Sequence, residues 1–146
     1  MQKSLDFQSQ RTIKPAISMN NIRVLIVDEH VEVRRALAAR LGAYTHIEVV
    51  ATARSFQEGL ERVRAFQPDV ILLEIKGASN LQPNPVGEMA KVLGDHPTGI
   101  IVLTSYADDT EREAALQAGA RRYLLKHIDS ARLLSEIEAV ATEIAT

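Results

Sequence analysis

The chain has 146 residues, 46% hydrophobic and 4% aromatic, which suits one domain with an aliphatic core and is too short for two. Its formal net charge of -2 argues against direct nucleic-acid binding, and the absence of cysteine excludes disulfides, thiolate metal sites and a cysteine nucleophile. Its apolar runs are strand-sized and no signal peptide is recognisable, so we expect a cytoplasmic protein without a membrane span.

The first twenty residues are polar and aperiodic, which predicts a flexible N-terminal arm (1–20) ahead of a single domain (21–146). From there, strand-like and helix-like segments alternate. In the first half of the domain, three apolar runs predict strands at Ile22–Val27, Ile47–Ala53 and Val70–Leu73. The helix expected between the first two strands has the apolar stripe Val33, Leu37 and Leu41. The helix expected between the second and third begins with the capping box Ser55 and Glu58.

The second half begins with a segment, 76–99, that is rich in glycine, proline and asparagine. This composition predicts a long loop holding one short helix, Val86–Leu93. The elements expected after it are a strand at Gly99–Leu103, a helix at Asp109–Ala118 closed by Gly119, a strand at Arg122–Leu125 and a final helix from Asp129 or Ser130. Five strands alternating with helices predict an α/β fold: a single doubly wound, five-stranded parallel sheet with helices on both faces.

Polar side chains follow four of these strands directly, where a buried strand would end. They are Asp28-Glu29, Glu74, Thr104-Ser105 and Lys126. In an open parallel sheet the functional groups gather at the carboxyl ends of the strands. Two acidic strand ends at one edge therefore predict a metal or phosphoryl site.

Four stretches, VLIVDEH, PDVILLEI, IIVLTSY and AGARRYLLK, resemble response-regulator receiver domains in their order and spacing. The resemblance runs from about Ile22 to Val140 and is nearest to receivers that precede helix-turn-helix output domains. It implies a flavodoxin-like strand order, 2-1-3-4-5, and a non-enzymatic role in two-component signalling. The partner that it implies is a histidine kinase or another signalling protein.

The resemblance also assigns roles to the strand-end residues. In a receiver, Asp28 and Glu29 would hold Mg²⁺, for which carboxylate oxygens are suitable ligands. Glu74 stands where the family has its phosphoacceptor aspartate. Thr104 matches the hydroxyl that bonds the phosphoryl group, and Lys126 matches the lysine that neutralises its charge.

Two further positions and one surface are implied by the same resemblance. Tyr123 matches the aromatic switch residue, and Ser105 a position that shapes access to the site. The region Asp109–Thr142 corresponds to a surface that commonly carries output contacts, and we expect a possible homodimer through it. Its charges are expected to lie on an exposed face and to form reciprocal pairs: Arg112, Arg121, Arg122 and Arg132 opposite Glu111, Glu113 and Glu136.

The sequence departs from the family at the phosphoacceptor and in the loop after it. Glutamate adds one methylene, moving the carboxylate by about 1 Å, and a misplacement of that size costs about a hundredfold in rate. The longer side chain is expected to approach Lys126 and Thr104 directly. The loop has Gly77-Ala78 where receivers have a Met-Pro pair, which alters the surroundings of the metal ligand expected from the Lys76 carbonyl.

Three hypotheses follow. The first is a pseudo-receiver that does not use ordinary aspartyl phosphorylation and acts through partner binding or dimerisation. The second is a working phosphoacceptor receiver of a transcriptional regulator, whose DNA-binding domain is absent from this chain. The third is a flavodoxin-like enzyme or cofactor binder, which is disfavoured because Asp28-Glu29-His30 occupies the turn where a glycine-rich phosphate loop would lie.

Overall fold

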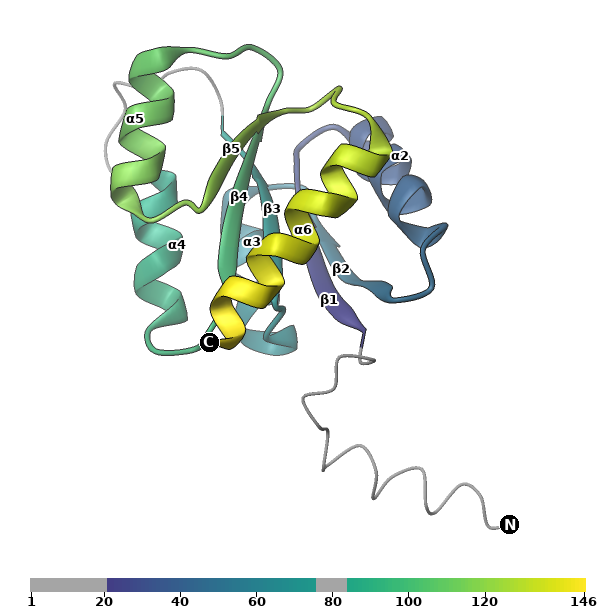
Figure 1. Cartoon of the computed structure of the whole chain (residues 1–146). Helices are drawn as coiled ribbons and strands as arrows, with labels where there is room; N and C mark the ends of the chain where they lie inside the picture. Colours follow the sequence, from purple (N-terminus) through teal and green to yellow (C-terminus); the bar gives the residue numbers. More distant parts are fainter. Residues whose placement is uncertain (1–20, 76–83) are drawn as a thin grey trace, which may run out of the picture.

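The structure is a computed structural model that describes residues 21–75 and 84–146. The expected arm (1–20), and the loop segment 76–83 with the expected ligand Lys76, lie outside the described residues. One parallel sheet has the order β2-β1-β3-β4-β5 (Figure 1). Its strands are β1 (Ile22–Val27), β2 (Ile47–Ala53), β3 (Val70–Glu74), β4 (Gly99–Thr104) and β5 (Arg122–Leu125). The predicted parallel sheet and its flavodoxin-like strand order are confirmed.

Helices cover both faces of this sheet (Figure 1). They are α2 (Val31–Gly42), α3 (Phe56–Phe66), α4 (Pro85–Leu93), α5 (Asp109–Ala118) and α6 (Ser130–Ala145). Helices α2 and α6 pack on one face, through residues such as Leu41 and Ile137. Helices α3, α4 and α5 pack on the other, where Met89 is fully buried. The short helix predicted at Val86–Leu93 is α4, which begins one residue earlier.

The central strands are mostly apolar because both of their faces are covered. In β1, Val24 and Ile26 face the α2–α6 side, whereas Leu25 and Val27 face the α3–α4–α5 side. Burying a side chain of this size stabilises the fold by about 1.5–3 kcal/mol. The strands therefore form a rigid frame that ends in polar residues at the carboxyl edge.

Local signals fix the ends of α3 and α5. The Ser55 side chain accepts a hydrogen bond from the Glu58 amide (3.1 Å), as the capping-box pattern predicts. The Asp108 carboxylate caps α5 in the same way, by accepting from the Glu111 amide (2.8 Å). Helix α5 ends at Gly119, whose φ of +123° is strained for a residue with a side chain.

The two outer strands are irregular or short. The pairing of β1 with β2 shifts register between Val24 and Leu25, whose partners are Val49 and Ala51, so Val50 is an extra residue in β2. The other outer strand, β5, has four residues, all half-buried. A bulge of this kind bends and twists the strand that carries it.

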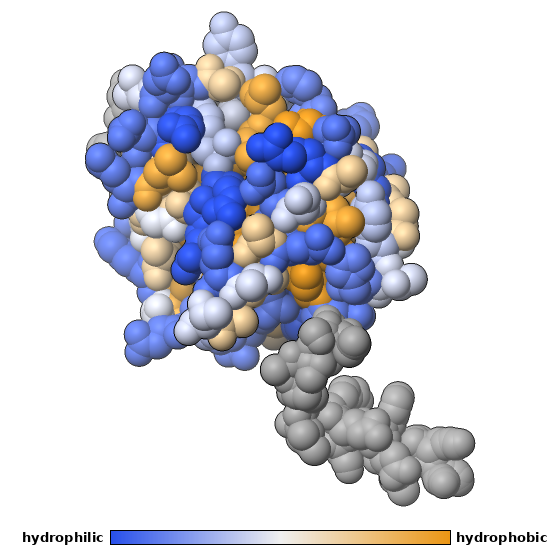
Figure 2. All heavy atoms as spheres, viewed as in Figure 1, coloured by the Kyte–Doolittle hydropathy of each residue, from blue (hydrophilic) through white to orange (hydrophobic). Residues whose placement is uncertain are grey.

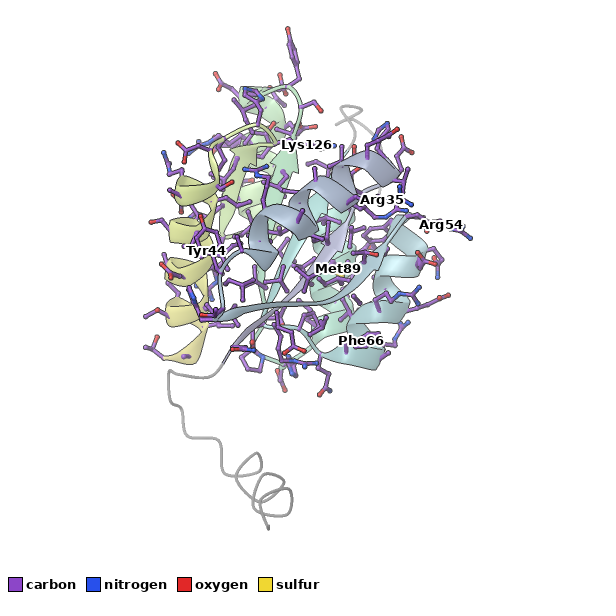
Figure 3. The ribbon with its side chains drawn as sticks, turned by 90° about the vertical axis from the view of Figure 1, so that its right-hand side faces the viewer. Arg35, Tyr44, Arg54, Phe66, Met89 and Lys126 are labelled. Atoms are coloured by element: carbon purple, nitrogen blue, oxygen red, sulfur yellow. The ribbon has the colours of Figure 1, made fainter. Side chains whose placement is uncertain are left out.

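The surface is mixed in character. Figure 2 shows hydrophilic side chains interleaved with smaller hydrophobic areas over the face that carries α6. Within the described ranges, no helix combines the length and the apolar character that crossing a bilayer requires. Figure 3 shows Met89 inside the domain and Lys126 near one end of the strands, with Phe66 toward the opposite end. Lys126 marks the edge where the predicted functional residues meet.

Candidate functional site

Three predicted site residues are brought together at the carboxyl edge of the sheet. Asp28 follows β1, Glu74 ends β3 and Lys126 follows β5. The Lys126 ammonium lies between the two carboxylates, 2.6 Å from Asp28 Oδ2 and 2.8 Å from Glu74 Oε2. The side chains of Lys126 and Glu74 are each 12% exposed, and that of Asp28 is 3% exposed. The predicted contact of Glu74 with Lys126 is therefore confirmed.

The buried ammonium controls the electrostatics of this group. Burial alone would raise the pKa of Asp28, but hydrogen bonds from Lys126 and from the His30 amide outweigh it and hold that pKa below its usual value. Burial alone would lower the pKa of Lys126, and its bonds to Asp28 and Glu74 reverse this, so that pKa is raised. Asp28 and Lys126 thus stabilise each other in their charged forms.

Glu74 is also fixed from the β1 side. Its second oxygen, Oε1, accepts a hydrogen bond of 3.2 Å from the Glu29 amide. The two oxygens of Glu74 are therefore both engaged, one with a buried ammonium and one with the backbone. This arrangement holds the carboxylate in one orientation at the position where the receiver resemblance expects a phosphoacceptor.

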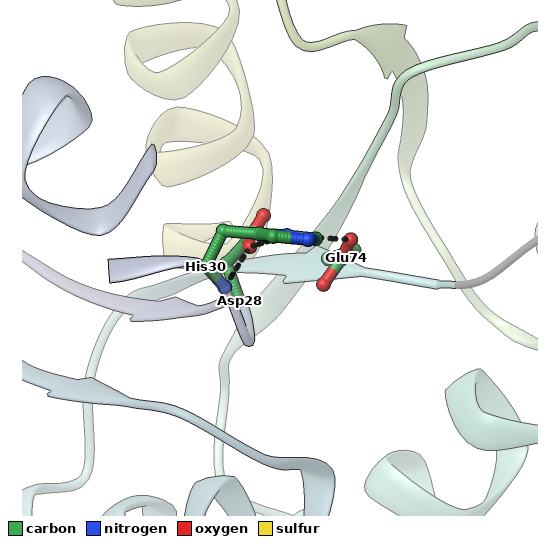
Figure 4. Close-up of side chains that lie close together, drawn as sticks. All are labelled: Asp28, His30 and Glu74. Carbon is green, nitrogen blue, oxygen red and sulfur yellow. Dashed lines mark hydrogen bonds and ion pairs between the residues drawn. The ribbon is translucent and has the colours of Figure 1, made fainter. Parts of the chain in front are cut away.

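His30 joins the site, although no role there is predicted for it. Its amide and its ring nitrogen Nδ1 lie 2.8 and 3.2 Å from Asp28 Oδ1, and Nδ1 lies 3.9 Å from Glu74 Oε2. Figure 4 shows the imidazole between the two carboxylates. The sequence signal for this contact is that His30 follows Asp28 by two residues, so that both lie in the turn after β1.

The donor set is chemically suited to Mg²⁺. Asp28 and Glu74 supply carboxylate oxygens, the ligand type that Mg²⁺ prefers. Ligand atoms of Asp28, His30 and Glu74 lie within 4.8 Å of one another. The carboxylates of Asp28 and Glu74 share the ammonium of Lys126. Asp28 Oδ1 and Glu74 Oε1 are the oxygens that Lys126 does not contact.

Thr104 ends β4 at the same edge and is buried, with 4% of its surface exposed. Its hydroxyl is engaged locally: it donates to the Tyr106 carbonyl (3.2 Å) and accepts from the Tyr106 amide (3.3 Å). The hydroxyl thus stabilises the turn after β4. Ser105 lies exposed in that turn, where its backbone rather than its side chain links Thr104 to Tyr106.

Tyr123 lies on β5, beside the beginning of α5. Its hydroxyl donates a hydrogen bond to Glu111 Oε1 and accepts one from the Asp108 amide (3.2 Å). Burial and the bond to Glu111 raise the pKa of Tyr123 to about 12. The exposed position predicted for Glu111 is wrong, because its side chain is 3% exposed.

The predicted contact surface carries ion pairs within the chain. The Arg122 guanidinium of β5 lies 2.6 Å from Glu136 and 2.6 Å from Glu143, both on α6. Arg132 also pairs with Glu136, at 3.0 Å. The hydrogen bonds from Arg122 lower the pKa of Glu136 and of Glu143, and the two ion pairs join β5 to α6.

Comparison with known proteins agrees with this arrangement. The family model of the response regulator receiver domain matches residues 24–138. The chain is 37% identical over 122 residues to the transcriptional regulatory protein LiaR of Bacillus subtilis (strain 168), covering 82% of this chain and 56% of LiaR. It is 29% identical over 110 residues to a protein-glutamate methylesterase/protein-glutamine glutaminase of Geobacillus kaustophilus (strain HTA426), covering 74% of this chain and 31% of that protein.

A solved structure shares the fold. The signal receiver domain of the putative response regulator NarL from Mycobacterium tuberculosis superposes with a TM-score of 0.74 at 23% identity, covering 84% of this chain and 98% of that domain. The chain thus spans about half of LiaR and nearly all of a separate receiver domain. The family match covers the sheet, the acidic edge and Lys126 together. The chain therefore belongs to the response regulator receiver domain family.

Proposed function

We propose that this receiver domain is a signalling module that ordinary aspartyl phosphorylation does not regulate, and that it acts through partner binding or dimerisation. The observation that carries the proposal is the Glu74 carboxylate, bound by Lys126 at 2.8 Å in the phosphoacceptor position. The same ammonium also binds Asp28, at 2.6 Å. The cation that would neutralise a phosphoryl group is thus already neutralised by carboxylates of this chain.

The geometry gives this proposal a physical basis. For in-line transfer, a carboxylate oxygen, the metal and the donor phosphorus must be aligned, and the extra methylene of Glu74 displaces that oxygen by about 1 Å. The contact between the buried ammonium and Glu74 is charge-assisted, and it resembles the contact that the same lysine would make with a phosphoryl oxygen. Glu74 in this position imitates part of the phosphorylated state.

A second candidate function is supported by the site residues other than Glu74. Asp28, Glu29, Thr104 and Lys126 keep the types that phosphoryl chemistry needs at these strand ends. In this alternative the chain is a phosphoacceptor receiver, with a histidine kinase as donor and Mg²⁺ held by the acidic edge. The resemblance to LiaR, a transcriptional regulatory protein, supports an output on DNA by a domain outside this chain.

The same proposal includes a cytoplasmic location and no enzymatic activity for the domain itself. One relative is a methylesterase, but this chain matches 31% of its length. The site has a buried lysine between carboxylates rather than an activated nucleophile beside a base. Its chemistry suits charge recognition.

An amide NMR titration with Mg²⁺ and beryllofluoride tests the proposal on the native chain, on Glu74→Asp and on Glu48→Asp. Glu48 is an exposed glutamate of β2 and serves as the matched control. We expect no response from the native chain or the control, and shifts around Thr104, Tyr123 and Lys126 in Glu74→Asp. A response in the native chain favours the phosphoacceptor alternative. If none of the three proteins shows amide shifts, shortening the Glu74 side chain alone does not restore the site.

A further inference from the structure

Among the described residues, Glu111 is a buried carboxylate without a cationic partner. Within the described ranges, Asp28, Thr104 and Glu111 are the buried polar side chains, and Asp28 is paired with Lys126. Glu111 Oε1 accepts a hydrogen bond from the Tyr123 hydroxyl, whereas Oε2 is buried and has no hydrogen-bond partner in the part of the chain that the structure describes. An apolar side chain would fill this space without losing hydration. The carboxylate therefore needs an explanation other than packing.

The contacts around Glu111 form a closed ring at the beginning of α5. The Glu111 amide donates to Asp108 Oδ2 (2.8 Å), the Asp108 amide donates to the Tyr123 hydroxyl (3.2 Å), and that hydroxyl donates to the Glu111 carboxylate. The Thr104 side chain acts on the Tyr123 hydroxyl in the opposite sense to Glu111, because it lowers the pKa of Tyr123. The ring thus joins β5 to α5 next to the end of β4.

We propose that Glu111 is a positioning residue that fixes the orientation of Tyr123 and, through it, the surroundings of Thr104. A tyrosine hydroxyl donates one hydrogen, so its direction is set by the acceptor that it finds. Glu111 supplies that acceptor from inside the domain. If Tyr123 turned outward, both oxygens of a buried carboxylate would lack partners, which strongly favours the inward orientation.

The inference goes beyond the proposed function because it holds for either mode of regulation. Tyr123 and Thr104 are the positions that the receiver resemblance assigns to reading the site. With Glu111 as acceptor, their arrangement depends on α5 as well as on the acidic edge. A partner that displaced the first turn of α5 would release Tyr123 without any change at Glu74.

The first test is a tyrosine titration with the sole tyrosine at position 123. The chain has three tyrosines, so Tyr44→Phe with Tyr106→Phe leaves Tyr123 as the reporter. Tyrosinate absorbance is measured in this background for native Glu111, Glu111→Gln, Glu111→Leu and the control Glu113→Leu, whose glutamate is exposed on the same helix. With native Glu111, the pKa of Tyr123 is expected at about 12.

In Glu111→Leu we expect this pKa to fall, because the acceptor and its negative charge are removed. In Glu111→Gln it should fall as well, since the charge is lost, while the amide oxygen still accepts the hydroxyl. At neutral pH, the amide resonances of Asp108 and Thr104 should therefore shift in the leucine variant and stay near their native positions in the glutamine variant. Native-like amide resonances in Glu111→Gln but not in Glu111→Leu would show that Glu111 acts as a hydrogen-bond acceptor for Tyr123 and not only by filling space.

An unchanged pKa in Glu111→Leu would overturn the proposal, as would equal shifts in Glu113→Leu. If the leucine variant does not fold, as judged by circular dichroism, the glutamine variant decides. A lowered pKa with a native-like Asp108 amide then supports the proposal, and an unchanged pKa refutes it.

Discussion

Replacing Lys126 by methionine removes the ammonium and keeps a side chain of similar length. In the native chain this group lies 2.6 Å from Asp28 Oδ2 and 2.8 Å from Glu74 Oε2. The variant leaves two carboxylates facing each other at the edge of the core, one of them 3% exposed. Removing one partner of a buried pair destabilises a protein by about 3–5 kcal/mol. Domains are stable by about 5–15 kcal/mol, so this loss is large.

The loss is expected to depend on pH with a definite sign. In the native fold the pKa of Asp28 is held below its unfolded value, so its stabilising contribution is present above the unfolded pKa and is lost as pH falls through the folded pKa. Without Lys126, burial dominates and raises that pKa, so protonation stabilises the variant. The difference in the free energy of unfolding should be largest near neutral pH and already smaller at pH ~4, where carboxyl groups begin to protonate.

Urea unfolding followed by circular dichroism, near neutral pH and near pH ~4, measures both effects. The control is Lys91→Met, because Lys91 is 76% exposed and pairs with Glu88 at 3.1 Å on the surface of α4. That change should alter stability by no more than about 0.5 kcal/mol. A loss for Lys126→Met below about 1 kcal/mol, or one of equal size at both pH values, would refute the assignment of a buried ionic cluster.

Two further substitutions test the packing and the helix caps. Gly99→Ala places a Cβ 2.3 Å from Val140 Cγ1 of α6, and the overpacking should destabilise the fold by about 1–3 kcal/mol in urea unfolding. At Gly42 the added methyl meets nothing within 4 Å, so Gly42→Ala is the control, and equal stability of the two variants would contradict this packing. Ser55→Ala removes the acceptor of the Glu58 amide and should destabilise the protein by about 1 kcal/mol, with faster amide hydrogen exchange in the first turn of α3. Unchanged exchange there would mean that the cap contributes nothing.

The strands could be predicted from the sequence because both faces of the central ones are covered. Their apolar runs therefore begin and end sharply, and β1 and β5 have the predicted bounds. Strands β3 and β4 each extend one residue further, to Glu74 and Thr104. Those residues still pair with neighbouring strands, Glu74 with Leu103 and Thr104 with Leu125, although their side chains are polar.

The site could be predicted only as far as strand ends determine it. The approach of Lys126 to Glu74 follows from parallel strands that end at one edge. The burial of Glu111 could not be predicted, because its surroundings in sequence, from Asp108 to Glu113, are mostly charged and resemble a solvated helix start. What covers Glu111 includes Tyr123, twelve residues later, so the environment of the carboxylate depends on tertiary structure.

The two outermost strands bear on how the domain meets other chains. A long, flat outer strand offers free amides and carbonyls on which a second chain can extend the sheet. Here one outer strand, β2, is bulged at Val50 and the other, β5, offers four residues. Both features disfavour intermolecular strand addition, including the first step of cross-β aggregation. A partner would therefore contact the side chains of the helices and loops of this domain rather than the backbone of an outer strand.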